Sequence, residues 1–221
     1  MSIRGVLFDF SGTLFRLEPD LSGLVDLDGN PLEGEHHAEV MRRMTAPTGR
    51  PEGLPERLHD HWDERDLAPP LHRELYHAVL HGSGVGNPEL LYDRMLDTNN
   101  WEPYPDTAAA LKTLADAGIP IGVVSNIAWD IRPAFERIGV ADLVSEFVLS
   151  FQEGAVKPDP RIFTVACERL GLPPEQVLMV GDSEEADGGA AKIGCAVAFV
   201  DPLPVGQRPN GLLDVLAENG W

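Results

Sequence analysis

Positive charge is scarce in this chain of 221 residues. It has 17 lysines and arginines against 36 aspartates and glutamates, which leaves a formal net charge of −19. A surface with this balance repels the phosphate backbone of nucleic acids and the anionic face of a membrane. We therefore expect neither nucleic acid nor a membrane as a partner. A small anionic substrate remains compatible with the charge, because a bound divalent cation reverses the local field.

Cysteines and long apolar runs are also scarce. Cys167 and Cys195 are the only two cysteines, and their apolar surroundings favour small core residues over a disulfide framework. No window is long and apolar enough to span a bilayer, and residues 1–5 lead straight into an apolar run, unlike a signal peptide. These absences favour a cytoplasmic globular protein.

The second half of the chain alternates between strand and helix patterns. Short apolar runs that end in polar turns predict strands at 121–124, 144–149, 177–180 and 196–200. Helical patterns cover 107–117, 131–138, 161–170 and 184–193, and each is followed by a glycine suited to a helix end. This alternation predicts an α/β fold with a doubly wound, Rossmann-like parallel sheet.

Residues 15–100 interrupt the alternation. They lack strong strand runs, contain all seven histidines and no lysine, and their Pro- and Gly-rich joints predict several short helices. We therefore predict an α/β core from residues 1–14 and 101–221, with an α-helical insertion at 15–100 in which 45–53 is a loop. The histidine spacings are not those of a structural zinc site, so we expect these side chains to be mostly solvated or partly buried.

Polar residues follow the predicted strands of the core. They are Asp9, Ser11 and Thr13 after the first apolar run, Ser125 and Asn126 after the second, Lys157 after the third, and Asp182 and Asp187 after the fourth. In an open parallel sheet, ligands bind beyond the carboxyl ends of the strands. Carboxylates, a hydroxyl–amide turn and an ammonium group gathered there suit phosphoryl transfer, because they supply a nucleophile, a magnesium site and donors for phosphate oxygens.

The same residues, in order, resemble the four motifs of the haloacid dehalogenase (HAD) superfamily of hydrolases. The matching segments are Asp9–Thr13, Val124–Asn126, Gly154–Phe163 and Gly181–Asp187. The resemblance implies that the 15–100 insertion is the helical cap of that superfamily, placed between the first and second motifs. It also implies a hydrolase with a small phosphorylated substrate.

The resemblance implies a role for each matched residue. Asp9 would be the nucleophile that forms an aspartyl-phosphate, and Lys157 would neutralise charge beside it. Asp9, the backbone carbonyl of Ser11 and Asp182 would hold Mg²⁺, with Asp187 supporting them from behind. The substrate- and phosphate-binding set would be Ser11, Thr13, Ser125, the backbone of Asn126 and, because it follows the first motif closely, Arg16.

Ser11 departs from the pattern of the superfamily's phosphatases, which carry Asp at this position to protonate the leaving group and later to activate water. Serine is a poor acid and a poor base, and such proton transfer contributes about 10²–10⁴-fold to the rate. We therefore expect slow turnover of alkyl phosphates, a smaller loss with acyl or aryl phosphates, and a longer-lived aspartyl-phosphate.

Two other functions stay open. In a 2-haloacid dehalogenase, Asp9 would attack carbon and displace halide. Such relatives need no magnesium, usually lack a carboxylate at the position of Asp182 and usually carry an aromatic residue at that of Ser11, so this function ranks lower. A catalytically degenerate binding protein could keep the fold without turnover. Asp9 and Lys157 favour chemistry over this last alternative, because binding alone needs no nucleophile.

Overall fold

The computed structural model describes residues 2–45 and 49–221. Two parts of the chain lie outside the described residues. They are residue 1, in the segment 1–5 that is unlike a signal peptide, and residues 46–48 of the expected 45–53 loop. The chain divides into two compact units. Residues 1–16 and 102–221 make up the first, here called the α/β unit, and residues 17–101 make up the second, the helical unit.

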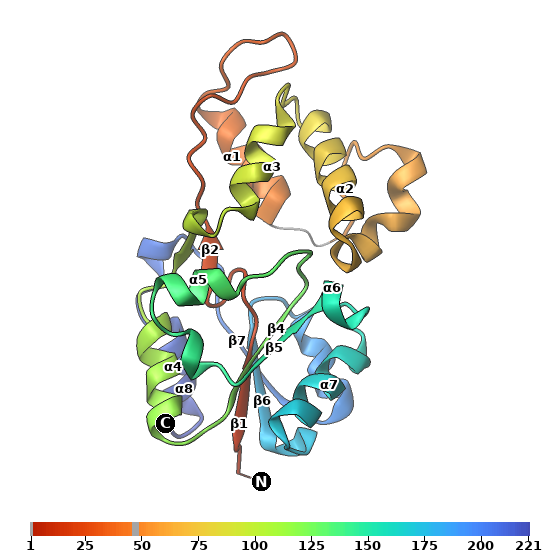
Figure 1. Cartoon of the computed structure of the whole chain (residues 1–221). Coiled ribbons are helices and arrows are strands. Elements are labelled where there is room, and N and C mark those ends of the chain that lie inside the picture. Colours follow the sequence, from red (N-terminus) through yellow and green to blue (C-terminus); the bar gives the residue numbers. More distant parts are fainter. Residues whose placement is uncertain (1, 46–48) are drawn as a thin grey trace. The chain divides into compact units, whose positions relative to one another are not determined.

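A five-stranded sheet forms the centre of the α/β unit (Figure 1). Its strand order is β5-β4-β1-β6-β7, and every neighbouring pair is parallel. The strands are β1 (Gly5–Phe8), β4 (Ile121–Ser125), β5 (Glu146–Leu149), β6 (Val177–Gly181) and β7 (Ala196–Phe199). The first strand lies in the middle and the chain adds strands outward on both sides, which confirms the predicted doubly wound α/β fold.

The register of the central strands aligns their carboxyl ends. Phe8 of β1 is paired with Val123 of β4 on one side and with Val180 of β6 on the other. All four residues of β1 are buried, as expected for a parallel strand covered on both faces. The residues that follow these strands, Asp9 among them, therefore emerge side by side at one edge of the sheet.

Helices cover both faces of this sheet. α4 (Thr107–Asp116) and α8 (Gly211–Glu218) lie on one face and α7 (Pro160–Leu170) on the other (Figure 1). The shorter elements are α5 (Arg132–Arg137), α6 (Ser150–Glu153) and the 3₁₀ helices η3 (Ala141–Leu143), η4 (Pro174–Gln176), η5 (Asp187–Ile193) and η6 (Val205–Gln207). Three of the four predicted helices of the core thus form as α-helices.

The fourth predicted helix, 184–193, is instead the shorter 3₁₀ helix η5. Two glycines near its start weaken an α-helix, and Gly189 lies so close to Pro158 that a Cβ there would sit 2.7 Å from the proline Cβ. The Asp187 carboxylate also accepts the N–H groups of Asp182 and Ser183, which holds 182–186 in a turn. The prediction was wrong in helix type and in its first residue.

The helical unit contains α1 (Glu35–Thr45), η1 (Glu56–Leu67), α2 (Pro69–Gly82), α3 (Pro88–Leu96) and η2 (Thr98–Asn100). Its core packs η1 against α2 through Leu58, Trp62, Leu75 and Val79. His72 is buried there and is the exception among the seven histidines, since the other six are exposed or partly buried, as expected. A short strand, β2 (Phe15–Leu17), also forms at the start of the segment expected to be helical, and it pairs with β3 (Trp101–Pro103).

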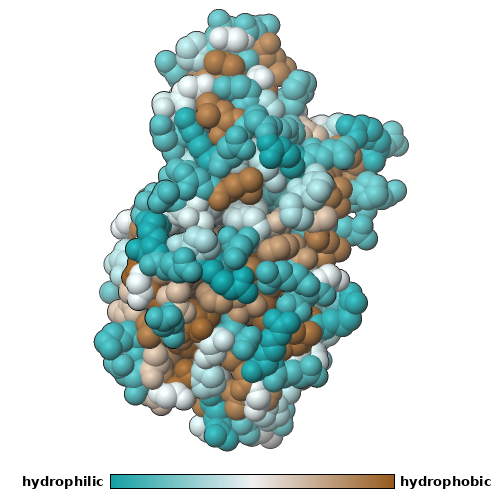
Figure 2. All heavy atoms as spheres, in the orientation of Figure 1, coloured by the Kyte–Doolittle hydropathy of each residue, from teal (hydrophilic) through white to brown (hydrophobic). Residues whose placement is uncertain are grey.

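Hydrophilic residues cover much of the molecular face shown in Figure 2, between smaller hydrophobic patches. In the described part of the chain, no helix combines the length and the apolar character that crossing a membrane requires.

Candidate active site

Lys157 joins two carboxylates at the carboxyl edge of the sheet. Its Nζ lies 2.6 Å from Asp9 Oδ1 and 2.6 Å from Asp187 Oδ1. Asp9 follows β1, Lys157 lies between α6 and α7, and Asp187 begins η5. All three side chains are buried, and buried charges persist only where opposite charges and hydrogen bonds compensate them.

Asp182 adds a third carboxylate to this group. One oxygen each from Asp9, Asp182 and Asp187 lies within 4.8 Å of the others. Gly12, in the turn after β1, has a φ of +80° and lies directly against the Asp182 carboxylate, so that any Cβ would collide with it. The turn and the carboxylate can approach this closely only because residue 12 is glycine.

Negative charge exceeds positive charge in this cluster, and the pKa values respond. Burial raises the pKa of Asp9 well above its usual range, against the opposing charge of Lys157, and the nearby carboxylates of Asp187 and Asp182 raise it further. Burial, followed by the charge of Asp187, raises the pKa of Asp182. Burial alone would lower the pKa of Lys157, but the charges of Asp187 and Asp9 outweigh it and raise that pKa. When fully ionised, the three carboxylates and the one ammonium of this cluster carry a net charge of −2.

The next predicted site residues of the α/β unit are Thr13, Ser125 and Asn126. Ser125, at the end of β4, and Thr13 are both buried, and Thr13 Oγ1 has no hydrogen-bond partner among the described residues. The Asn126 side chain instead holds the backbone of Lys157: its Oδ1 accepts the Lys157 N–H at 2.7 Å and its Nδ2 donates to the Lys157 carbonyl at 3.0 Å. Asn126 therefore positions Lys157, and its backbone N–H is the group left for a ligand.

Arg16, the predicted substrate contact, is bound to the segment after β7. Its guanidinium donates to the Pro202 carbonyl at 2.6 Å. Arg208, from the same segment, was missed: it is buried and donates to the carbonyls of Gly12 and Thr13. No signal in the sequence could have identified it, because an arginine in a Pro- and Gly-containing stretch is usually a surface residue.

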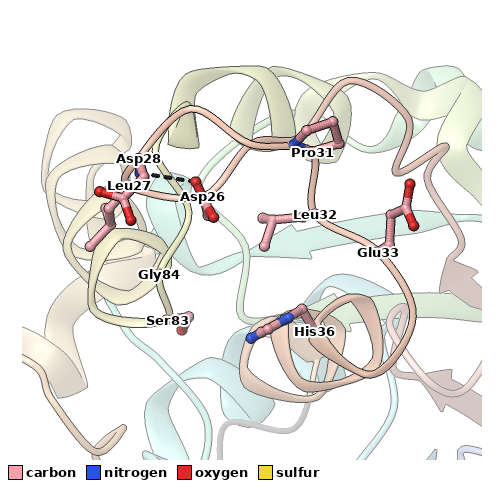
Figure 3. Close-up of a pocket in the computed structure, with 9 residues that line it drawn as sticks. All are labelled: Asp26, Leu27, Asp28, Pro31, Leu32, Glu33, His36, Ser83 and Gly84. Carbon is pink, nitrogen blue, oxygen red and sulfur yellow. Dashed lines mark hydrogen bonds between the residues drawn. The ribbon is translucent and has the colours of Figure 1, made fainter.

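The helical unit has a pocket of its own, of about 410 Å³ (Figure 3). Its lining includes the acidic side chains of Asp26, Asp28 and Glu33 beside His36. The Asp26 carboxylate is engaged by the N–H groups of Asp28 and Asn30 within its own turn. The lining contains none of the predicted site residues and is acidic, so the charged cluster around Lys157 remains the candidate active site.

A family model described as haloacid dehalogenase-like hydrolase matches residues 3–194. The chain belongs to this family. Among curated relatives, it is 29% identical over 195 residues to (S)-2-haloacid dehalogenase 4A of Burkholderia cepacia, covering 87% of this chain and 80% of the relative. It is 33% identical over 134 residues to glyceraldehyde 3-phosphate phosphatase of Methanopyrus kandleri, covering 53% and 58% of the two chains.

Solved structures of the haloacid dehalogenase-like family share the fold. A dehalogenase with an intermediate complex superposes with a TM-score of 0.66 and 23% identity, over 98% of this chain and 97% of that structure. At this identity the likeness concerns the fold alone. The chain is therefore a hydrolase of the HAD superfamily, and its relatives include both phosphatases and dehalogenases.

Proposed function

We propose that this hydrolase is a cytoplasmic, magnesium-dependent phosphatase that acts on a small phosphorylated metabolite through an aspartyl-phosphate at Asp9. The observation that carries the proposal is Asp182, a third carboxylate whose oxygen lies within 4.8 Å of oxygens of Asp9 and Asp187. Displacement of halide needs no such carboxylate, whereas a divalent cation prefers carboxylate and carbonyl oxygens.

The residues present fit Mg²⁺. Asp9, Asp182 and the Ser11 carbonyl would hold the ion, and Asp187 would support them through Lys157 and the N–H groups of residues 182 and 183. Among the described residues, no hydrogen bond is donated to the Ser11 carbonyl. When bound, Mg²⁺ would neutralise charge on the phosphoryl oxygens and orient them.

The chain's own residues account for the remaining chemistry. A carboxylate oxygen of Asp9 attacks phosphorus, and the bond from phosphorus to the leaving oxygen breaks. The Lys157 ammonium holds Asp9 in place, while the Ser125 hydroxyl and the Asn126 N–H donate to phosphoryl oxygens. Water then attacks the phosphorus of the acyl phosphate, which releases phosphate and restores the Asp9 carboxylate. Because Ser11 is a weak acid and base, leaving groups of low basicity are favoured and the intermediate persists.

The helical unit would act as the cap that selects the substrate, and Arg16 and Thr13 would contact the substrate.

A second candidate is hydrolytic dehalogenation of a 2-haloacid. The observation that favours it is the match to the Burkholderia dehalogenase across 87% of this chain. In that reaction an Asp9 oxygen would attack the carbon that bears the halogen, halide would leave, and water would hydrolyse the resulting ester.

One experiment separates these functions. The purified chain and Asp9→Asn are given acetyl phosphate, an aryl phosphate, an alkyl phosphate or 2-chloropropionate, each with Mg²⁺ or with a chelator. Phosphate, halide and the intact mass of the protein are followed. Magnesium-dependent phosphate release with a phosphorylated protein, both lost in Asp9→Asn, supports the phosphatase. Halide release that survives the chelator supports the dehalogenase instead, and no product of either kind supports a binding protein.

A further inference from the structure

Arg208 is a buried arginine that contacts the turn carrying Ser11 from outside the matched family region. It lies after residue 194, where the family match ends, and only 5% of it is exposed. Nη1 donates to the Gly12 carbonyl at 2.7 Å, and Nη2 donates to the Thr13 carbonyl. The guanidinium carbon also lies 3.2 Å from the centre of the Tyr104 ring, a stacking arrangement that suits arginine better than lysine.

These contacts explain why one carbonyl of the turn stays open. Every carbonyl from residue 10 to residue 15 except that of Ser11 accepts a hydrogen bond within the described part of the chain. The donors are the N–H groups of Gly12, Leu14, Phe15 and Tyr104, the Thr107 hydroxyl and the Arg208 guanidinium. Without Arg208, the carbonyls of residues 12 and 13 would join that of residue 11 in needing a partner.

We propose that Arg208 is a positioning residue for the divalent-cation site. By holding the carbonyls of Gly12 and Thr13, it fixes the turn so that the Ser11 carbonyl alone is available to a cation. This inference rests on the magnesium site of the proposed function. The link to the carboxylates is Gly12, which packs directly against Asp182, so a shift of the turn also changes the place of a metal-binding carboxylate.

Arg208 is itself firmly held. The segment that carries it leads into α8, whose N–H groups at Leu212 and Leu213 donate to Asp106 Oδ2 at 2.7 and 3.1 Å. Gly211 packs against the arginine stem, since a Cβ at that position would lie 2.8 Å from Arg208 Cδ. The planar Arg208 guanidinium, with its stem packed in place, can fix the positions of two carbonyls. The flexible ammonium of a lysine cannot do this.

Positioning and simple charge predict opposite effects on Mg²⁺. The positive charge of Arg208 interacts electrostatically with Asp182. By charge alone, it would therefore repel a cation bound at Asp182 and weaken the binding of that cation. If charge were its only influence, removing it would tighten Mg²⁺ binding. If Arg208 positions the turn, removing it weakens binding, because the carbonyl and carboxylate ligands are no longer held in place.

The test is Mg²⁺ affinity, measured by isothermal titration calorimetry on the full chain without substrate. The proteins are the wild type, Arg208→Lys, Arg208→Gln and the control Arg94→Gln. Arg94 is a matched arginine, because its guanidinium likewise donates to two backbone carbonyls, those of Asp20 and Ser22 in the helical unit. We expect both Arg208 variants to bind Mg²⁺ about tenfold more weakly or worse, as with other residues that orient metal ligands. Arg94→Gln should lower the melting temperature and leave the affinity unchanged.

Four results would overturn the inference. Tighter binding in Arg208→Gln with wild-type affinity in Arg208→Lys would show an effect of charge alone. Wild-type affinity in both, with lower melting temperatures, would show a purely structural role. If neither variant folds, Gly211→Ala, which keeps the arginine but displaces its stem, is measured instead, and unchanged affinity there would count against positioning. Failure of the wild type to bind Mg²⁺ would overturn the metal site itself, and with it this inference.

Discussion

The ammonium of Lys157 and the carboxylate of Asp9 lie 2.6 Å apart although 148 positions separate them in the sequence. Both side chains are buried, and the same ammonium also bonds Asp187. One cation therefore compensates two buried carboxylates, and the stability of the α/β unit depends on it.

Lys157→Met should be strongly destabilising because it leaves both carboxylates buried without a partner. We expect the free energy of unfolding at neutral pH to fall by about 3–5 kcal/mol, as measured by urea denaturation. Lys157→Met/Asp187→Asn should recover part of this loss, since one unpaired carboxylate is then gone. A loss below about 1 kcal/mol, the range of an exposed pair, would contradict the structural role given to Lys157.

Ser11→Asp should restore the missing proton transfer. We expect turnover of an alkyl phosphate at saturating Mg²⁺ to rise by up to about 10²–10⁴-fold, as measured by phosphate release. Ser11→Ala is the control and should show no such gain, because it keeps the backbone carbonyl of the proposed metal site but supplies no acid or base. If Ser11→Asp is no faster than the wild type, the departure at this position does not limit the reaction.

Gly12→Ala should disturb both the backbone and the carboxylates. Gly139→Ala is a matched control, because Gly139 has a φ of +71° against +80° for Gly12, but an added Cβ there meets nothing within 4 Å. The control should cost about 1–2 kcal/mol of stability for its left-handed backbone. Gly12→Ala should cost more and should also reduce the rise in melting temperature that Mg²⁺ produces. Equal effects of the two variants would argue against close packing of Gly12 on Asp182.

The buried His72 should make the helical unit sensitive to acid. Its ring stacks on Tyr76 and its Nδ1 lies 2.9 Å from the Tyr92 hydroxyl oxygen. Burial, aided by the charge of Arg65, lowers the pKa of His72 from 6.5 to about 3. The folded state therefore binds a proton at His72 less readily than the unfolded state does. This contribution to the free energy of unfolding is fully present above pH 6.5, the ordinary pKa of histidine, and is lost as the pH falls toward the folded-state pKa of about 3.

The expected slope for His72 is about 1.4 kcal/mol per pH unit within that window. Urea denaturation at a series of pH values measures it. His72→Phe keeps a ring of similar size without a titrating group, so it should flatten the dependence. Parallel curves for the two proteins would show that His72 is not the responsible group.

Much of the core could be predicted from the sequence because its signals are local. The strands are short apolar runs with a polar residue directly after them, and parallel pairing brings those polar residues to one edge. The fourth helix could not be predicted in its observed form, because its geometry depends on contact between Gly189 and the distant Pro158. Two long-range contacts at the site could not be predicted either. Asn126 holds the backbone of Lys157, and Arg208 reaches the turn after β1, but no periodic pattern in the sequence marks either pairing.

The central position of β1 has a consequence for the synthesis of the chain. This strand emerges from the ribosome before the other strands of the sheet, and its partners β4 and β6 begin only at residues 121 and 177. At about 5–20 residues per second, the apolar run Val6–Phe8 waits on the order of ten seconds before either edge can pair. Asp187 is made later still, so no nascent chain that ends before it can assemble the charged cluster.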